Sequence, residues 1–484
     1  MNWLLAFLTV ITLASSLHPT YSLTTRIQST LALPPDYCTE DIPGYFESTE
    51  YMYGSTAVLV VFLESDGSIM EQSQNWTTAE KQDKKSEINW TLNWFEEQEP
   101  RANVTFIPVY FDVDTGYESI DLPRRDIGLW AGEAMSYLGH PALGRHWTYQ
   151  VWDFVNQERK DLGTDWCVVL FLIDSSDDDD GKFPDGGAAF NDPGGPLIYM
   201  TSTLAFDDPD SFSVVFAEEL ANVFWASDED LGIVYYSGYL NTTNTPLSGC
   251  LMHNHTWCLS NGTRQQLGWR DLDGDNKLDI VDTQPVATIV STKTTGDTLN
   301  VSGVASVTAY PNSNPHSNTY PIRRNVTIKE IETIMYRIDE GNWTNAEITP
   351  TTVKMLHKWP DTYIEKNTKA TVNFTFLADS LEVGNHSVQI KVIDDWDNYA
   401  YLNTTIEIKE FLDTDLNQDG TVNIMDVAIV AQAYGAKYNE TDGMYWHDPP
   451  CKRCPHASNT DLDGNKEINI LDVAKVAKDY GKTT

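Results

Sequence analysis

The spacing of hydrophobic positions changes along the chain and divides it into three segments. Between residues 36 and 284, apolar runs with strand character alternate with stretches in which apolar residues recur at helical spacing. This alternation predicts an α/β layer structure. The expected strands are Thr56–Leu63, Val104–Tyr110, Cys167–Leu172 and Leu197–Thr201, and the expected helices are Thr77–Gln98, Ile127–Leu138 and Trp147–Lys160.

The second segment, residues 285–410, contains short runs of alternating polar and apolar residues separated by turn residues, which predicts an all-β sandwich. Two stretches, Met335–Trp343 and Gly384–Asp395, resemble strands of immunoglobulin-like modules found in secreted microbial proteins. That resemblance implies a spacer or adhesion unit without chemistry of its own. The expected strands are Val326–Ile328, Thr371–Phe376, Ser387–Val392 and Tyr401–Ile408.

The third segment, residues 411–484, contains an internal repeat of a short acidic loop followed by an apolar helix that ends in Tyr-Gly. In both copies, oxygen-bearing side chains stand at positions 1, 3, 5, 7 and 12, a spacing that wraps a tight loop around Ca²⁺. A solvated acidic turn is the alternative for either copy alone. Val422 and Ile468, at position 8, are expected to pair the two loops. The expected ligands are Asp415, Asn417, Asp419, Thr421 and Asp426 in the first loop, and Asp461, Asp463, Asn465, Glu467 and Asp472 in the second.

This duplicated pattern, with Asp at position 12, resembles the dockerin module, a small α-helical domain with paired EF-hand-like calcium loops. The resemblance implies calcium-dependent docking into a cohesin-like partner or another cell-surface protein. Lys466 stands where the first loop has Gly, and we expect it to weaken the second site because Lys disfavours positive φ. An insert between the copies forms a small zinc site, a disulfide or a plain loop; its candidate residues are His447, Cys451, Cys454 and His456.

A third loop with the same spacing precedes the sandwich, where we expect it to stiffen the junction between the first two domains. Another acidic run, between Asp174 and Asp180, lacks the spacing and is expected to be a solvated turn. The expected ligands of the third loop are Asp271, Asp273, Asp275, Asp279 and Asp282.

Charge and export signals place the chain outside the cell. A formal net charge of −39 excludes nucleic acid as a partner and favours divalent cations. Residues 1–22 resemble a secretory signal peptide, with a buried helix or membrane anchor as the alternative, and no later segment is apolar enough to span a bilayer. Thirteen Asn-x-Ser/Thr triplets are typical of an exported glycoprotein.

Six cysteines, an even number in an exported chain, predict disulfides. Proximity in the sequence suggests a pair between Cys250 and Cys258. A pair between Cys38 and Cys167 is also expected, although the sequence alone does not fix the connectivity. Within the insert, Cys451 and Cys454 are the remaining candidates.

The stretch from Phe216 to Glu229 has the frame of the H-E-x-x-H zinc helix without its histidines. In that motif two His residues, one helical turn apart, bind Zn²⁺, and the Glu activates the metal-bound water. Glu218 and Asn222 occupy the His positions here, and Glu219 keeps the general-base position. Because Zn²⁺ prefers nitrogen and sulfur donors, this oxygen set should bind it poorly, and Ca²⁺ or Mg²⁺ would suit it better.

Together with Gly249–Met252 and Thr263–Arg270, this helix resembles secreted microbial metzincin-like metallopeptidases across roughly residues 50–284. The resemblance implies a general-base role for Glu219, a third-ligand role for Asp228 and a Met-turn role for Met252. The replacements at the two His positions imply that catalysis has been lost.

We therefore expect a metzincin-like α/β domain at residues 36–284, an immunoglobulin-like sandwich at 285–410 and a dockerin-like domain at 411–484. The expected function is extracellular recognition or assembly by a degenerate metallopeptidase homologue. One alternative is an active endopeptidase whose metal sits on Glu218, Asp228 and either His253 or His255. The other is a dockerin-borne polysaccharide-binding or polysaccharide-degrading component.

Overall fold

The computed structural model describes residues 38, 40–203, 211–316, 324–409, 412–446 and 457–483. The expected signal peptide at 1–22 and the Cys451 and Cys454 candidates lie outside these residues. Among the helices in the described part of the chain, none combines the length and apolar character that a membrane crossing requires.

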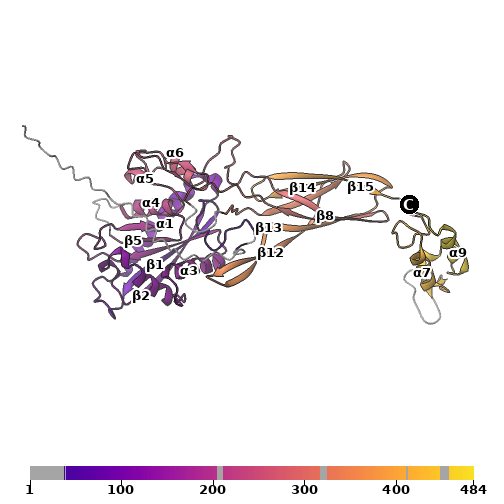
Figure 1. Cartoon of the computed structure of the whole chain (residues 1–484), viewed down its shortest axis with the longest axis horizontal. Coiled ribbons are helices and arrows are strands. Elements are labelled where there is room, and N and C mark those ends of the chain that lie inside the picture. Colours follow the sequence, from indigo (N-terminus) through magenta and orange to yellow (C-terminus); the bar gives the residue numbers. More distant parts are fainter. Residues whose placement is uncertain are drawn as a thin grey trace, which may run out of the picture. The chain divides into compact units, whose positions relative to one another are not determined.

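The first domain is built on a five-stranded sheet in the order β2-β1-β3-β5-β4 (Figure 1). β1 pairs in parallel with β2 and β3, β3 pairs in parallel with β5, and β4 is an antiparallel edge strand. The continuous apolar runs of β1 and β3 fit strands that are buried on both faces. The strand bounds are β1 Ser55–Ser65, β2 Thr105–Thr115, β3 Trp166–Ile173, β4 Ala189–Asn191 and β5 Leu197–Thr201.

Helices cover both faces of this sheet and create two cores. On one face, α1 (Thr78–Gln98) and α4 (Ser211–Val223) pack over Val58, Val60 and Phe62. On the other face, α2 (Gly128–Tyr137) and α3 (Trp147–Leu162) pack over Leu59, Val61 and Phe171. The mixed α/β architecture predicted from the sequence is therefore present.

The remaining elements of the first domain are short and lie mostly after α4. Their bounds are η1 Pro100–Ala102, η2 Ser119–Asp121, η3 Arg124–Asp126, β6 Tyr236–Ser237, β7 Thr242–Thr243, α5 Leu251–Asn254 and α6 Asn261–Gln266.

Two four-stranded antiparallel sheets, β11-β10-β14-β15 and β12-β13-β9-β8, follow the first domain. They enclose one core that includes Val301, Ile334, Phe374 and Ile390, so the all-β layout expected here is present. The bounds are β8 Val286–Thr295, β9 Thr298–Ser306, β10 Ile331–Ile338, β11 Thr344–Asn345, β12 Glu347–Lys358, β13 Thr362–Ala378, β14 Gly384–Asp394 and β15 Tyr399–Ile408.

The segment before β10 differs from the prediction, because residues 326–328 form no strand. Val326 is instead fully buried in the core of the first domain, and its backbone accepts hydrogen bonds from the hydroxyls of Tyr51 and Tyr239. Alternating apolar and polar residues predict a strand here, yet Val326 and Ile328 pack into the core of the first domain instead.

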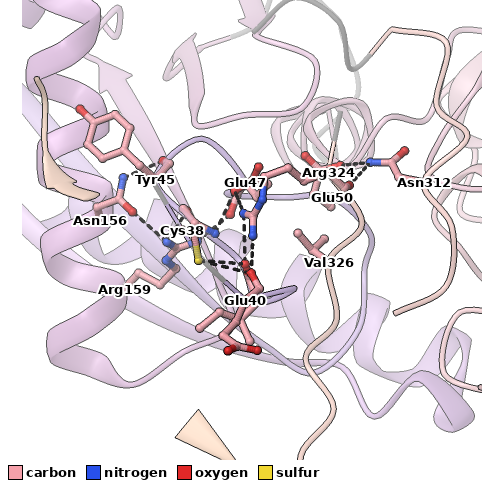
Figure 2. A network of polar contacts seen from close by, with 12 residues as sticks. Cys38, Glu40, Tyr45, Glu47, Glu50, Asn156, Arg159, Asn312, Arg324 and Val326 are labelled. Atoms are coloured by element: carbon pink, nitrogen blue, oxygen red, sulfur yellow. Dashed lines mark hydrogen bonds and ion pairs between the residues drawn. The ribbon is translucent and has the colours of Figure 1, made fainter. Parts of the chain in front are cut away.

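Arg324 strengthens the same contact, as Figure 2 shows. Its guanidinium donates to Glu47 Oε2 at 3.0 Å and to the carbonyl oxygens of Glu40 and Ile42. Nearby, Asn312 donates to the buried Glu50 carboxylate at 3.3 Å. The boundary expected at residue 285 is thus crossed by a returning segment that packs with the first domain.

The cysteines follow the prediction only in part. Cys250 and Cys258 form a disulfide. The expected Cys38–Cys167 pair is wrong, because both residues are free thiols. Cys167 lies inside β3 and belongs to the core under α2 and α3, whereas Cys38 Sγ contacts the carbonyl oxygens of Glu40 and Ile42.

The C-terminal repeat folds around α7 (Ile424–Ala433) and α9 (Ile470–Asp479), which contact one another. Both helices begin with a capping box, formed by Asn423 with Asp426 and by Asn469 with Asp472. The other elements are β16 Lys437–Asn439, β17 Met444–Trp446 and α8 Ala457–Thr460.

Val422 and Ile468 do not pair with each other as predicted. Val422 exchanges backbone hydrogen bonds with Gly481 and Lys482, and Ile468 does so with Gly435 and Ala436. Each loop thus pairs with the segment that follows the helix of the other repeat. Both side chains remain fully buried in the shared core, so the prediction found the right residues but the wrong partners.

Candidate functional site

The centre of α4 carries the polar residues of the degenerate motif on an otherwise apolar helix. Glu219 is buried, and its Oε2 accepts a hydrogen bond from Asn191 Nδ2 at 2.5 Å. Asn191 Nδ2 also donates to Asn222 Oδ1 at 3.1 Å. Asn191 comes from the edge strand β4 and was missed in the sequence analysis, because no motif spacing connects it to α4.

Asn222 uses its amide nitrogen within the protein. Its Nδ2 donates to the Ala226 carbonyl oxygen at 2.9 Å and to Asp228 Oδ1 at 3.2 Å. The structure therefore brings Glu219, Asn222 and Asp228 together, as the motif frame predicts. Hydrogen bonds connect these residues. The Asn222 amide nitrogen, which can only donate, faces the Asp228 carboxylate.

Glu218 forms an ion pair with His255, whose Nε2 lies 2.7 Å from Glu218 Oε2. His255 ends α5 in a left-handed conformation at φ 49, directly after a stretch that begins at Cys250 of the disulfide. His253 is engaged elsewhere, since its Nδ1 accepts the Gly249 amide at 2.8 Å. Of the two candidate histidines, only His255 reaches α4.

These contacts determine the electrostatics of the site. Burial raises the pKa of Glu219 to about 8, the hydrogen bond from Asn191 opposes this rise, and repulsion from Glu218 and Asp228 adds to it. Asp228 keeps an exposed edge, but protein packed around its carboxylate, followed by repulsion from Glu218, raises its pKa to about 6. The hydrogen bond to Glu218 raises the pKa of His255.

Zinc does not fit this arrangement. The two positions that carry His in the zinc motif hold a carboxylate paired with His255 and an amide bonded to Asp228. Because burial raises the pKa of Glu219 to about 8, the charged form of this carboxyl is disfavoured in the site. Hydrogen bonds link Glu219 and Asn222 through Asn191, and Asn222 to Asp228, while Asn191 Oδ1 is buried without a partner among the described residues.

Buried residues that follow α4 in the sequence pack against the helix and fix the loops around it. Met252 is fully buried in α5, in the core that also contains Leu220 of α4. Glu229, which the sequence analysis assigned no role, is buried, and its Oε1 accepts from the Thr245 amide, Ser260 Oγ and Thr263 Oγ1 at 2.8, 2.6 and 3.2 Å. Glu229 therefore fixes the loops that follow α4.

The two C-terminal acidic loops, loop 1 (415–426) and loop 2 (461–472), share one hydrogen-bond pattern. The carboxylate at position 12 accepts the amides of positions 2, 3 and 9 in both loops. In loop 2, carboxylate oxygens of Asp461, Asp463 and Asp472 lie within 4.8 Å of one another. Oxygens gathered in this way fit a hard cation such as Ca²⁺.

Other expected ligands of these loops also have protein partners. Asn417 Nδ2 donates to Asp419 Oδ2 at 2.9 Å, and Asn465 Nδ2 donates to Asp463 Oδ2 at 2.9 Å. Glu467 faces Lys437 at 3.1 Å, which leaves its backbone carbonyl for the role of position 7. The side-chain oxygens of Asn417 and Asn465 accept the amides two residues later.

All three acidic loops use the same backbone turn, including loop 3 (271–282). Positions 4 and 6 have positive φ in every loop: 55 and 85 in loop 1, 71 and 71 in loop 2, and 77 and 77 in loop 3. Gly420 occupies position 6 of loop 1, whereas Lys466, at φ 71, occupies it in loop 2. The Lys466 strain predicted from the sequence is therefore present in the structure.

Loop 3 differs in its side chains. Oxygens of Asp271, Asp273 and Asp275 lie within 4.8 Å of one another. Asp279, in contrast, is held by Arg270 Nε at 2.5 Å and accepts the Leu272 amide, and Asp282 is not part of the cluster. The structure thus assembles the first three expected ligands and directs the fourth to an arginine.

Loop 3 is bonded to both neighbouring domains. Asp271 pairs with Arg101 of the first domain at 2.8 Å. Lys277 Nζ donates to Asn398 Oδ1 at 2.8 Å, and Asn398 Nδ2 donates to the Val281 carbonyl oxygen at 2.6 Å. Asn398 precedes β15 of the sandwich, so these contacts join the two domains through the loop.

No protein-family model matches the chain, and no curated protein matches it either. Similar solved structures include OgpA from Akkermansia muciniphila, at 10% identity over 78% of this chain and 97% of that chain, with a TM-score of 0.27. The PKD1 domain of the Vibrio cholerae metalloprotease PrtV is 14% identical over 26% of this chain and 99% of that chain, with a TM-score of 0.14.

The sulfane dehydrogenase SoxCD from Paracoccus pantotrophus is 18% identical over 24% of this chain, with a TM-score of 0.15. The matched part spans 23% of the SoxCD chain. All three TM-scores lie well below 0.5.

Proposed function

We propose that this protein is a secreted or cell-surface, calcium-stabilised homologue of metallopeptidases that has lost catalysis and acts in extracellular recognition or assembly. In this proposal the C-terminal domain docks into a cohesin-like partner while the first domain serves as a non-catalytic unit. The first part of the proposal rests on the α4 site, and the second rests on the repeated loops.

The observation that carries the loss of catalysis is the pairing of Glu218 with His255 at 2.7 Å. The residue at the first motif position, Glu218, is thus engaged by His255. The second position, Asn222, is bonded to Asn191 and Asp228. The side chains at both motif positions thus have protein partners, and neither position carries an imidazole of its own for zinc.

The docking part is supported by a repeated apolar surface on the C-terminal domain. The first turn of α7 exposes Ile424 and Met425 at 63% and 58%, and the first turn of α9 exposes Ile470 and Leu471 at 63% and 55%. Single exposed apolar residues are ordinary. Here the same positions are exposed in both repeats, which fits a surface that binds a partner through an apolar contact.

Calcium fits both loops by donor chemistry, since each presents carboxylate, amide and backbone oxygens in a 12-residue turn. Bound Ca²⁺ would neutralise part of a strongly acidic chain. It would also hold the first turns of α7 and α9, because position 12 of each loop is the N3 residue of the helix's capping box. The docking surface would then depend on the cation.

A second candidate function is supported by the same His255 contact. If Glu218 and His255 rotated apart to bind a metal together with Asp228, the site would resemble a metal-dependent hydrolase with a non-standard ligand set. This candidate requires that the ion pair and the Asn222–Asp228 hydrogen bond open. It therefore predicts metal-dependent activity that His255→Ala abolishes.

The test is peptide hydrolysis by the purified full-length protein with Zn²⁺, Ca²⁺ or Mg²⁺ supplied, alongside Glu219→Gln and His255→Ala. The proposal predicts no cleavage by any of the three proteins. Cleavage by the wild-type chain that disappears in Glu219→Gln would overturn it. A polysaccharide panel, used with the same protein, tests the remaining alternative of a carbohydrate-directed component.

The docking claim is tested by titrating the full-length protein with isolated cohesin modules by calorimetry, with Ca²⁺ and with excess chelator. Ile424→Asp combined with Ile470→Asp removes the apolar contact, and Lys478→Glu is a surface control on α9. We expect calcium-dependent binding that only the double variant loses. Binding that survives both chelation and the double variant would contradict the proposed surface.

A further inference from the structure

Asparagines in Asn-x-Ser/Thr triplets are more exposed than the other asparagines of the described chain. All thirteen triplet asparagines lie in the described part of the chain, and all are exposed. Of the sixteen other described asparagines, seven are exposed, and Asn156, Asn244, Asn314 and Asn398 are buried. The exposed triplet residues are Asn75, Asn89, Asn103, Asn241, Asn254, Asn261, Asn300, Asn325, Asn342, Asn373, Asn385, Asn403 and Asn439.

The amide nitrogens show the same division. Among the triplet asparagines, only Asn89 uses its Nδ2 as a donor to a described residue, to the Lys85 carbonyl oxygen at 2.7 Å. Among the sixteen others, ten donate through Nδ2, including Asn191, Asn222 and Asn398. The atom that carries the sugar in N-linked glycosylation is therefore available at twelve of the thirteen triplets.

One sheet of the sandwich gathers three of these residues around its outward face. Residues two apart on a strand point to the same side of a sheet. In β14 and β15, Val388, Ile390 and Val392 face the core, so Asn385 and Asn403 face outward. Asn342 follows β10, next to Trp343.

The outward face contains a shallow groove of about 370 Å³. Its lining includes Arg337, Gln389, Asn403 and Thr405. Tyr401 lies two residues before Asn403 on the same face of β15, and its ring centroid is 6.0 Å from that of Trp343. Flat rings beside planar polar groups form a surface on which a sugar ring stacks and hydrogen-bonds.

A chain of contacts orients Asn403 in this groove. Asn403 Oδ1 accepts from Gln389 Nε2 at 2.8 Å, and Gln389 Oε1 accepts from Arg337 Nε at 2.9 Å. The Arg337 guanidinium lies over the Trp343 ring at 4.8 Å. Because the amide oxygen is held, the amide nitrogen of Asn403 has a fixed direction and no partner among the described residues.

We propose that this face of the sandwich carries N-linked glycans on Asn342, Asn385 and Asn403, and that the Asn403 glycan lies in the groove beside Tyr401. In the modification, a separate transferase catalyses the reaction of Asn403 with an oligosaccharide diphosphate. Asn403 Nδ2 forms a bond to the anomeric carbon of that donor. The bond from that carbon to the diphosphate oxygen breaks, the diphosphate leaves with the electron pair, and one amide proton is released.

An oligosaccharide from another molecule would use the same rings and polar groups. The structure favours the chain's own glycan, because the groove includes both the acceptor Asn403 and Thr405, the third residue of its triplet. This inference does not rest on the docking or peptidase proposals. The C-terminal domain carries a single triplet, at Asn439, so the first turns of α7 and α9 stay free of attached sugar.

The experiment is glycopeptide mass spectrometry on the full-length protein secreted by its native source. We expect a glycan mass on Asn342, Asn385 and Asn403, and none on Asn345 or Asn367, which are exposed but lie outside triplets. Unmodified peptides as the only species at all three positions would overturn the proposal.

A second measurement tests the position of the Asn403 glycan. Thr405→Ala removes the triplet, whereas Thr405→Ser keeps it and serves as the matched control. Nitration of tyrosine, read by mass spectrometry, should be slow at Tyr401 in the wild type and in Thr405→Ser, and should be markedly faster in Thr405→Ala. Equal nitration of Tyr401 in all three proteins would contradict the proposed position of the Asn403 glycan. So would binding of a free oligosaccharide in the groove while Asn403 is unmodified.

Discussion

His255 Nε2 lies 2.7 Å from Oε2 of Glu218, the residue at the first His position of the zinc motif. Where the zinc motif has a nitrogen ligand, this chain has a carboxylate whose hydrogen-bond partner is an imidazole. The contact links α4 to the residue that ends α5.

Restoring both histidines should restore a zinc site. We expect Glu218→His combined with Asn222→His to bind one Zn²⁺ per chain, because it recreates two nitrogen donors one helical turn apart. Glu218→Gln combined with Asn222→Ala breaks the same contacts without adding donors, and should gain no zinc. The readout is metal content after dialysis, and equal zinc in both double variants would contradict the prediction.

The Glu218 contact should also shift the titration of His255. The hydrogen bond raises the pKa of His255, so the folded protein holds this proton more tightly than the unfolded chain. The resulting stabilisation is fully present below the ordinary imidazole pKa and is lost as the pH rises through the raised value. NMR titration should show a lower His255 pKa in Glu218→Gln; an unchanged midpoint would count against the ion pair.

Chelation of calcium should loosen the C-terminal domain alone. Carboxylates at positions 1, 5 and 12 of loop 1, and at positions 1, 3 and 12 of loop 2, repel one another without a cation. We therefore expect residues 412–483 to become sensitive to protease in excess chelator. The sandwich, with its own apolar core, should stay resistant. Limited proteolysis followed by mass spectrometry checks this, and a tail that stays resistant would contradict calcium-dependent folding.

Backbone strain at Lys466 should weaken loop 2. Replacing a non-glycine residue at positive φ by Gly relieves about 1 kcal/mol, or roughly fivefold in calcium affinity. We therefore expect Lys466→Gly, and likewise Gln418→Gly at φ 55 in loop 1, to bind calcium more tightly. Lys478→Gly, inside α9, should instead destabilise the domain, because Gly is a poor helix former. Weaker calorimetric affinity in Lys466→Gly would refute the strain argument.

Lys329 and Asp394 form an ion pair at 3.0 Å with both side chains fully buried. Lys329 also donates to Thr283, directly after loop 3. Lys329→Met should lower the free energy of unfolding by about 3 kcal/mol, since it leaves a buried carboxylate without its cation. Lys81→Met breaks the exposed pair with Asp112 and should cost less than about 1 kcal/mol. Similar losses in urea unfolding would argue against the buried pair as a junction element.

The sequence predicted those features that depend on local spacing. Apolar periodicity located β1, β3 and α1 within a few residues, and comparison of the two repeats predicted the positive φ of Lys466. The positive φ of Gln418 was not predicted. Local spacing does not predict contacts between residues that are distant in the sequence. Asn191 reaches Glu219 only because β4 is the edge strand beside α4, and Val422 pairs with Gly481 only because the two repeats exchange their ends.

Two incorrect predictions have the same origin. Cys38 and Cys167 were paired by counting cysteines, but β3 buries Cys167 in a core that Cys38 does not enter. Alternating residues predict a strand at 326–328, but the hydroxyls of Tyr51 and Tyr239 donate to the Val326 carbonyl oxygen from the first domain. In both cases tertiary packing overrode a local signal.

The central claim is that the α4 site has exchanged zinc chemistry for internal hydrogen bonds while the acidic loops keep calcium. Elemental analysis of the purified full-length protein tests it most directly, with zinc and calcium counted per chain after dialysis against both metals. We predict bound calcium and no stoichiometric zinc. One zinc per chain that is lost in His255→Ala would contradict the account.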